Sequence, residues 1–330
     1  MGDKIALPRR QIWPFPVMAV LFAVLPWLLS SDYHISILIF VGIYTILALG
    51  LNLLMGYAGQ VSLGHAAFYG IGAYTTAILT TMLKWPPWLG LAAAVVVAGL
   101  VAYLIGLPTL KLRGHYLAMA TLGFGMIVRI VFVECYPLTG GTSGLTGLPT
   151  LSIAGFELFE DRHYYYVVWF FVLLLIWLSY NIVDSRVGRA LRAVHGSETA
   201  AASSGVDTAK YKVQVFVLSG MYSGLAGALY AHYIRFVNPD PFGFMFSIEL
   251  VVMVVVGGMA SIWGAIVGAG TITLLSQCLQ RFEDYEVIVF GLILMIVMVF
   301  LPMGLTKAAV DMTSRWRMTK ARRAASKGEL

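Results

Sequence analysis

Uninterrupted apolar stretches of about twenty residues recur along the whole chain, and they constrain its fold more than any other feature. A helix of about twenty residues crosses the roughly 30 Å hydrocarbon core of a bilayer. The stretches lack the alternation of polar and apolar residues that is typical of membrane β-barrel strands. With 59% hydrophobic and 12% charged residues, the composition also excludes a soluble enzyme, a disordered chain and a secreted disulfide scaffold. The sequence therefore predicts an all-α polytopic membrane protein.

The hydropathy pattern predicts about ten transmembrane helices. They are expected at residues 15–31, 35–55, 60–83, 88–107, 115–134, 164–182, 212–234, 246–258, 260–280 and 286–303. The third opens with glycines and polar residues, so it is a candidate for a broken helix near residues 56–72. The eighth and ninth are separated only by Gly257 and Gly258.

The basic residues indicate how these spans are oriented. With ten spans, both termini share a side, and the loops of that side hold 17 of the 22 lysines and arginines. These loops are residues 1–14, 108–114, 183–212 and 304–330. Because cytoplasmic loops carry the excess of Lys and Arg, both termini are expected to be cytoplasmic. The basic tail is then expected to contact anionic lipid, in preference to nucleic acid.

The expected organisation is a single transmembrane domain over residues 15–303, with a cytoplasmic segment before it (1–14) and a basic cytoplasmic tail after it (304–330). The two longest loops face opposite ways, with residues 135–163 outside and residues 183–211 inside. Cys135 and Cys278 both fall near outer ends of spans; a disulfide between them is conceivable, but two unpaired small hydrophobic residues is the favoured interpretation.

The lack of certain motifs and polar groups in the sequence restricts the possible functions. No P-loop motif occurs, so the chain is not expected to bind ATP in that way. The six histidines are scattered singly, which disfavours a metal site or a membrane enzyme. Carboxylates are expected only in loops or near span ends, with Glu249 at an outer end, and Arg129 is the one clear intramembrane charge. Ion-coupled carriers usually have acids or histidines within the membrane, so ion coupling is disfavoured.

The start of the third span carries polar side chains that are costly at membrane depth unless they face partners or water. Gln60, Ser62 and His65 lie there among several glycines, followed by Tyr69. Two interpretations stay open. The segment could form a wall of a translocation path, or it could be a small-residue helix interface with polar groups bonded across it.

Small residues also recur at four-residue spacing later in the chain. Gly220 and Gly224 share a face of the seventh span, and Gly264 and Gly268 share a face of the ninth. Such faces favour close packing of helices within one bundle.

The inner loop 183–211 has the features of a short helical segment outside the membrane. Arg189 and Arg192 share a helix face. Ser197 is placed to cap a short helix through residues 200–202, and Gly205 suits its C′ position. The segment could fit a groove on a cytoplasmic partner, or it could be a connector held at the lipid headgroups.

Several motifs resemble the LivM-type permeases of branched-chain amino-acid ABC importers. The resemblance extends over about residues 40–305, in the order of that family. It is carried by residues 48–54, 56–68, 112–124, 139–145, 188–193, 257–264 and 302–305.

The resemblance implies a non-catalytic subunit of the inner membrane that pairs with a second, related permease, most simply as a heterodimer. Two cytoplasmic ATPases would bind the ATP and magnesium, so this chain would hold no cofactor, and an extracytoplasmic binding protein would deliver the substrate. Residues 188–206 are then the candidate ATPase coupling loop. Its expected site residues are Gly188, Arg189, Arg192, Glu198 and Gly205, and the expected path residues are Gln60, Ser62, His65 and Tyr69.

The substrate implied by the resemblance is leucine, isoleucine or valine. Related permeases for urea, short amides or other amino acids share much of the pattern and stay as the alternative. A carrier or channel that acts alone, driven by an ion gradient, is the second alternative.

Overall fold

A computed structural model describes residues 22, 24–27, 31–112, 114–153, 156–157, 159–279, 291–292, 295 and 304–306. The predicted first and tenth spans, 15–31 and 286–303, lie largely outside these residues. So do the N-terminal segment 1–14 and most of the tail.

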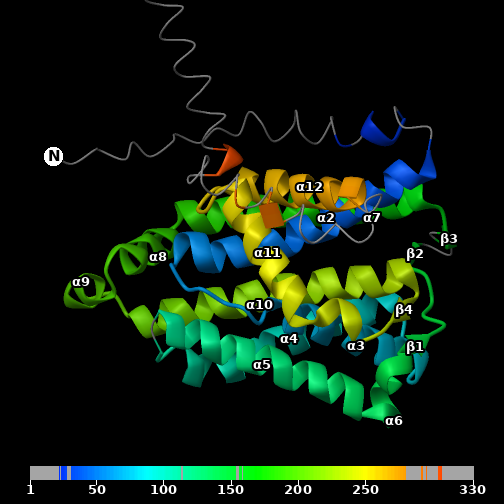
Figure 1. Ribbon diagram of the computed structural model, residues 1–330, viewed down its shortest axis with the longest axis horizontal. Helices are drawn as coiled ribbons and strands as arrows, with labels where there is room; N and C mark the ends of the chain where they lie inside the picture. Colours follow the sequence, from blue (N-terminus) through cyan, green and yellow to red (C-terminus); the bar gives the residue numbers. More distant parts are fainter. Residues whose placement is uncertain are drawn as a thin grey trace, which may run out of the picture.

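The described part is a bundle of helices with short connections (Figure 1). The longer helices are α2 (Asp32–Asn52), α3 (His65–Thr81), α4 (Pro87–Thr109), α5 (His115–Glu134), α7 (Asp161–Asp184), α10 (Thr208–Ile234), α11 (Phe244–Gly257) and α12 (Ile262–Leu279). Each coincides with one of the eight remaining predicted spans. Among the described helices, six are long and apolar enough to cross a membrane, and α3 and α11 are shorter. The prediction of an all-α polytopic membrane protein is therefore confirmed.

The shorter elements lie at the ends of these helices. They are η1 (Leu53–Tyr57), α6 (Tyr136–Thr139), η2 (Gly141–Ser143), β1 (Leu145–Thr146), β2 (Ser152–Ile153), β3 (Phe156–Glu157), α8 (Arg186–Gly196), α9 (Glu198–Ser203), β4 (Phe236–Val237) and η3 (Asp240–Phe242). Strand β1 pairs with β4, and β2 pairs with β3, both antiparallel.

Loops that were predicted to share a side of the membrane lie at the same end of the bundle. At one end, the Lys212 ammonium donates to the Leu110 carbonyl at 3.2 Å, which joins loop 108–114 to loop 183–212. At the other end, pairing of β1 with β4 joins the loops before α7 and after α10. Helices α8 and α9 therefore project from the end opposite to β1 and β4 (Figure 1).

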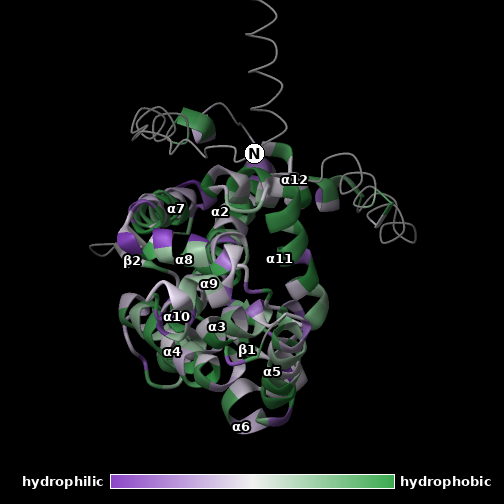
Figure 2. Ribbon diagram, turned by 90° about the vertical axis from the view of Figure 1, so that its left-hand side faces the viewer, coloured by the Kyte–Doolittle hydropathy of each residue, from purple (hydrophilic) through white to green (hydrophobic). Residues whose placement is uncertain are grey.

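Large apolar side chains cover the outside of the bundle, where a water-soluble protein would place polar groups. Exposed examples are Leu100 and Leu104 on α4, Ile127 on α5, and Phe170 and Trp177 on α7. Hydrophobic colour also covers α7 and α11 in the view onto the α8–α9 end (Figure 2). This surface suits hydrocarbon as its solvent.

Small residues let the central helices pack closely. A Cβ atom added at Gly72 of α3 would lie 2.1 Å from the Gly224 carbonyl oxygen of α10, and one added at Gly268 of α12 would lie 1.9 Å from the Met253 carbonyl oxygen of α11. At Gly220 it would lie 2.6 Å from the Ala102 side chain of α4. The small-residue faces are therefore packing faces within the bundle.

The predicted break occurs at the junction of the second and third spans. Helix α2 ends in the π-helical turn η1, and residues 58–64 then have no helical structure before α3 starts at His65. Gly59 has φ +69°, which favours glycine because it has no Cβ. The broken part thus covers the first half of the predicted stretch 56–72, and the second half is helical.

The chain between α10 and α11 dips into the bundle. Phe242 of η3 lies with its ring 5.1 Å from that of Tyr69 and 5.9 Å from that of Tyr74. Since Tyr69 is twelve residues from the end of α3, it lies about 18 Å along that helix from its outer end. Helix α11 therefore begins well inside the bundle rather than at the end where β1 and β4 lie.

This re-entrant path corrects the predicted place of Glu249. Glu249 lies one helical turn after Phe246 on α11, and the Phe246 ring is 5.3 Å from that of Tyr44, which lies twelve residues, or about 18 Å, into α2. Glu249 is thus near the middle of the bundle and not at an outer end. Arg129, an exposed side chain on α5, is therefore not the one clear intramembrane charge.

Candidate functional site

The side chain of His65 forms hydrogen bonds that join the broken segment, residues 58–64, to α10. Its Nδ1 lies 3.0 Å from the Ser62 hydroxyl, and its Nε2 lies 2.5 Å from the Ser219 hydroxyl. The ring is only 1% exposed. Because both ring nitrogens have partners, the buried imidazole is fully hydrogen-bonded, as a polar group in an apolar interior must be. Two of the expected path residues, Ser62 and His65, thus meet directly.

The other two expected path residues lie on either side of this pair. Gln60 is half-buried, and its amide donates to the Ala58 carbonyl at 3.1 Å. Tyr69 lies one helical turn beyond His65, with its ring stacked on Phe246 of α11. Its hydroxyl is buried and has no hydrogen-bond partner within the described part of the chain.

The buried side-chain amide of Asn52 joins the end of α2 to the turn between α11 and α12. The Asn52 side chain donates to the Ser261 carbonyl at 2.6 Å and accepts from the Ala260 amide at 2.9 Å. Asn52 ends α2, and residues 260 and 261 lie in the turn between α11 and α12. Sequence reasoning did not single out Asn52; the available signal was an amide at the end of an apolar run, where burial requires a partner.

Helix α8 contacts the same region from the end of the bundle. His195 Nδ1 lies 2.9 Å from the Gly56 carbonyl oxygen in η1. A displacement of α8 would therefore act directly on the turn that precedes the broken segment. Sequence reasoning also missed this contact, which joins residues 139 positions apart.

Residues 185–205 form two short capped helices, and the signals at Ser197 and Gly205 predicted the second of them. Ser185 caps α8 by accepting from the Val187 amide at 3.1 Å, and Ser197 caps α9 by accepting from the Ala200 amide at 3.3 Å. Gly205, with φ +82°, follows the end of α9. At Gly188, an added Cβ would lie 2.1 Å from the Val183 carbonyl oxygen, so the α7–α8 turn requires glycine there.

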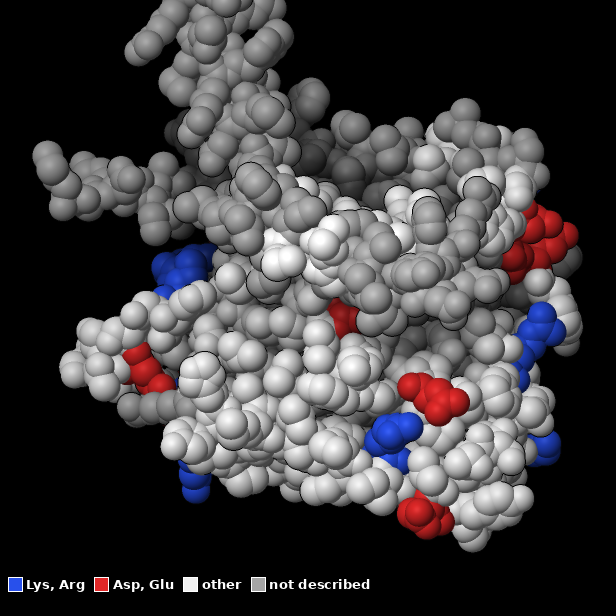
Figure 3. Space-filling model, in the orientation of Figure 1, with Lys and Arg blue, Asp and Glu red and all other residues white. Residues whose placement is uncertain are grey.

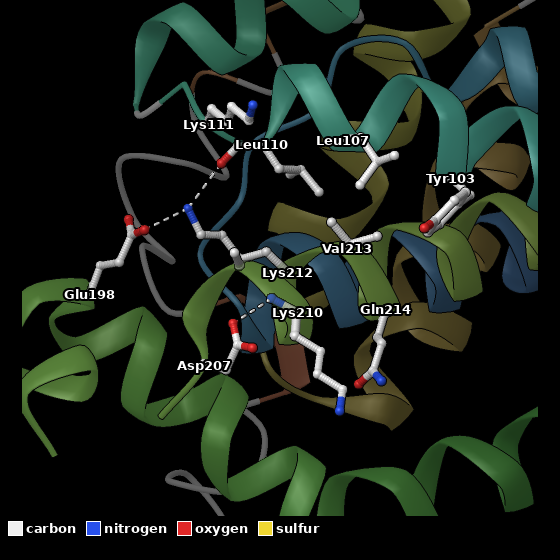
Figure 4. Close-up of a pocket in the computed structure, with 11 residues that line it drawn as sticks. Tyr103, Leu107, Leu110, Lys111, Glu198, Asp207, Lys210, Lys212, Val213 and Gln214 are labelled. Carbon is white, nitrogen blue, oxygen red and sulfur yellow. Dashed lines mark hydrogen bonds and ion pairs between the residues drawn. The ribbon is translucent and has the colours of Figure 1, made fainter. Parts of the chain in front are cut away.

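The charged residues of this segment differ in their surroundings. Arg189 is exposed and Arg192 is half-buried, both on α8. Glu198 instead forms an ion pair of 2.8 Å with Lys212, whose side chain is only 2% exposed. The same ammonium donates to the Leu110 carbonyl (Figure 4). The pair therefore links α9, α10 and the end of α4.

Two open pockets flank this link. One of about 640 Å³ lies between α4 and the start of α10, with Tyr103, Leu107 and Lys212 in its lining (Figure 4). The other, of about 470 Å³, is lined by basic side chains that include Arg186, Arg189 and Lys210. These hollows give the α8–α9 end an irregular, charged surface to which a soluble partner could bind.

Two further expectations concern cysteines and metals. Cys135 and Cys278 are both free, as favoured. Within the described ranges, no group of three histidine, cysteine or acidic side chains could hold a metal ion.

Comparisons with known proteins place the chain among transport permeases. The model of the family described as "Branched-chain amino acid transport system / permease component" matches residues 33–298. The high-affinity branched-chain amino acid transport system permease protein LivM of Escherichia coli K12 is 32% identical, over 92% of this chain and 78% of that protein. The probable LivM of Methanocaldococcus jannaschii is 23% identical, over 84% of this chain and 94% of that protein.

A second type of permease is also related. LivH of Escherichia coli K12 is 26% identical, over 79% of this chain and 90% of that protein. No solved structure matches the chain. The family match covers most of the chain, so the protein belongs to the family of permease components of branched-chain amino acid transport systems.

Proposed function

We propose that this chain is the membrane permease subunit of an ATP-driven importer for leucine, isoleucine and valine. The observation that carries the proposal is the similarity to LivM over 92% of the chain. The subunit itself is non-catalytic. Its sequence lacks a P-loop, which fits a system in which separate cytoplasmic ATPases bind ATP and magnesium and supply the energy.

The proposed topology is ten spans in a bacterial-type inner membrane, with both termini and the α8–α9 end in the cytoplasm. The basic loops support this orientation, since Lys and Arg concentrate on the cytoplasmic side. The proposed domain is residues 15–303, flanked by the short segment 1–14 and by the tail 304–330 at the lipid surface.

The proposed partners are a second permease, two ATPases and an extracytoplasmic binding protein. Similarity to both LivM and LivH supports the pairing, because the two relatives are permease proteins of one named transport system. A heterodimer of two related permeases is the simplest arrangement that agrees with this similarity.

The proposed mechanism is alternating access driven from the α8–α9 end. Movement of residues 188–206 would reach the broken segment through His195 and Gly56, which are in contact. Gln60, Ser62, His65 and Tyr69 would then lie along or support the path. Gly188 and Gly205 would give the coupling loop its turns, and Arg189, Arg192 and Glu198 would form its polar contacts.

Reconstitution tests the proposed function. Proteoliposomes that contain this chain, the related permease, the ATPases and the binding protein are expected to accumulate labelled leucine only when ATP is supplied. Vesicles with this chain alone should show no leucine uptake under a proton or sodium gradient. Gradient-driven uptake by the chain alone would establish an ion-coupled carrier instead, and uptake of urea or acetamide in place of leucine would overturn the substrate.

Charge reversal on α8 tests the coupling assignment. The double variant Arg189→Glu/Arg192→Glu is expected to lower ATP-driven uptake more than about tenfold and to reduce co-purification of the ATPases. The new carboxylates would face the groups of the ATPase that pair with the arginines, so the interface would contain repelling or unpaired charges. Lys84→Glu, an exposed charge at the opposite end of the bundle, should leave both measurements unchanged. Normal uptake and co-purification in the α8 variant would refute the docking role of these arginines.

A further inference from the structure

The re-entrant path between α10 and α11 places a carboxylate at membrane depth. Glu249 lies on α11 one helical turn after Phe246, whose ring is 5.3 Å from that of Tyr44, about 18 Å into α2. Half of a bilayer's hydrocarbon core is about 15 Å, so both side chains lie near the midplane. An acidic side chain in that position is costly and is retained where it serves an ion or substrate pathway.

Aromatic rings from four helices pack together about one helical turn from Glu249 on α11. Phe246 of α11 lies 5.3 Å from the ring of Tyr44 on α2 and 5.4 Å from that of Tyr69 on α3. Tyr69 in turn lies 5.4 Å from Tyr230 on α10. Tyr44, Tyr230, Phe246 and Glu249 are all half-buried, so they are neither packed away nor fully open. We name Tyr44, Tyr69, Tyr230, Phe246 and Glu249 the midplane cluster.

The molecular surface is hollowed on the side where α11 crosses the bundle. Figure 3 shows a small patch of acidic atoms near the middle of this face, set back from the white surface below it.

One polar atom of the cluster lacks a partner. The Tyr69 hydroxyl is buried, with 1% of the residue exposed, and no side chain or backbone group of the described residues bonds to it. The Tyr69 ring lies 5.4 Å from the rings of both Tyr230 and Phe246, within the same group of side chains. A buried hydroxyl without a partner is unfavourable, unless a ligand completes its hydrogen bonds.

We propose that the midplane cluster binds the α-ammonium group of the amino acid as it crosses the membrane; this inference rests on the proposed function. The Glu249 carboxylate neutralises the ammonium, which also lies against the faces of the tyrosine rings. The Tyr69 hydroxyl accepts a hydrogen bond from an ammonium N–H. The Phe246 ring contacts the branched side chain. The Glu249 carboxylate repels the α-carboxylate of the substrate, so the amino acid binds with its ammonium group toward Glu249. Neutral amides have no ammonium group and are not favoured by this site.

Substitutions at two positions in the complete transporter test this site. Glu249→Gln removes the charge at nearly constant volume and is expected to lower the maximal rate of ATP-driven leucine uptake about 10- to 100-fold, since it removes a charge-assisted hydrogen bond. The leucine concentration for half-maximal uptake should not change, because the binding protein sets it. Glu249→Asp should restore part of the rate. Tyr69→Phe should lower the rate about tenfold, as expected for the loss of one hydrogen bond to a charged group.

Tyr74→Phe provides the matched control. Tyr74 is also on α3, is buried, and has a hydroxyl without a partner among the described residues, but its ring stacks on Phe132 of α5 and does not belong to the midplane cluster. Its removal should leave uptake unchanged. Thermal unfolding of every variant separates a lost site from a lost fold.

The outcomes distinguish this inference from the function on which it rests. If the unmodified transporter takes up leucine and Glu249→Gln does so at the same rate, the ammonium site is refuted and the importer function stands. Proton movement coupled to leucine uptake in the unmodified transporter, abolished by Glu249→Gln, would make the carboxylate a proton carrier and also refute the site. Failure of the unmodified transporter to use ATP would refute the importer function itself.

Discussion

Replacing Glu198 with alanine is expected to lower the free energy of unfolding by about 3 kcal/mol, because it leaves a buried ammonium group without its counter-ion. Lys212 is 2% exposed, and its described partners are the Glu198 carboxylate at 2.8 Å and the Leu110 carbonyl at 3.2 Å. Loss of the carboxylate leaves one neutral acceptor for a full positive charge. The contact between α9 and the start of α10 should open first, since this pair holds it.

A double-mutant cycle isolates the pair. Glu198→Ala/Lys212→Met removes both charges and places an apolar side chain of similar length in the buried position, so it should recover most of the lost stability. Free energies are measured by denaturant titration of the purified protein in detergent micelles. Glu160→Gln breaks an exposed pair with His163 and should change stability by less than about 1 kcal/mol. An equally small effect of Glu198→Ala would show that water solvates Lys212 through the adjacent pocket.

The spans within the described residues were predictable because their signals are local. A run of apolar residues fixes the existence of a helix in lipid, and local caps fix its ends. Asp207 illustrates this, since it precedes α10 and accepts from the Lys210 amide at 3.0 Å. Ser197 and Gly205 likewise bound α9 as their residue types indicate.

The depth of a residue was less predictable, because it depends on tertiary contacts. Glu249 follows an apparent outer loop, so counting from the span boundary places it near the surface. The packing of Phe242 against Tyr69 and Tyr74 draws that loop inward and carries Glu249 with it. Nothing in the local pattern of residues 236–243 encodes this re-entry.

Only those residues of the candidate site that are close together in the sequence were predictable. Ser62 and His65 are three residues apart, so polarity within an apolar span singled both out. Their stabilising partner Ser219 is 154 positions from His65, and Asn52 meets Ala260 across 208 positions. Such pairs arise from the way helices pack, which one sequence without its structure does not specify.

The close approach of α3 and α10 leads to the second large effect. Gly227→Ala is expected to destabilise the protein by about 3 kcal/mol or more, since overpacking of a well-packed contact forces the backbone to move. The added Cβ would lie 2.0 Å from the Tyr69 carbonyl oxygen and 2.8 Å from the Ala73 amide nitrogen. Both are backbone atoms in the middle of α3, so a change of side-chain rotamer would not relieve the clash.

Gly123→Ala separates this steric effect from the general effect of alanine on a helix. Gly123 lies within α5, and an added Cβ there would meet no atom within 4 Å among the described residues. Alanine should therefore stabilise α5 by about 1 kcal/mol through its higher helix propensity. Both variants are compared by the same micelle titration and by ATP-driven uptake. Tyr69 belongs to the midplane cluster and also contacts Gly227, so a shift of α3 in Gly227→Ala should slow uptake as well. Equal stability and equal uptake in the two variants would refute the close packing of α3 on α10.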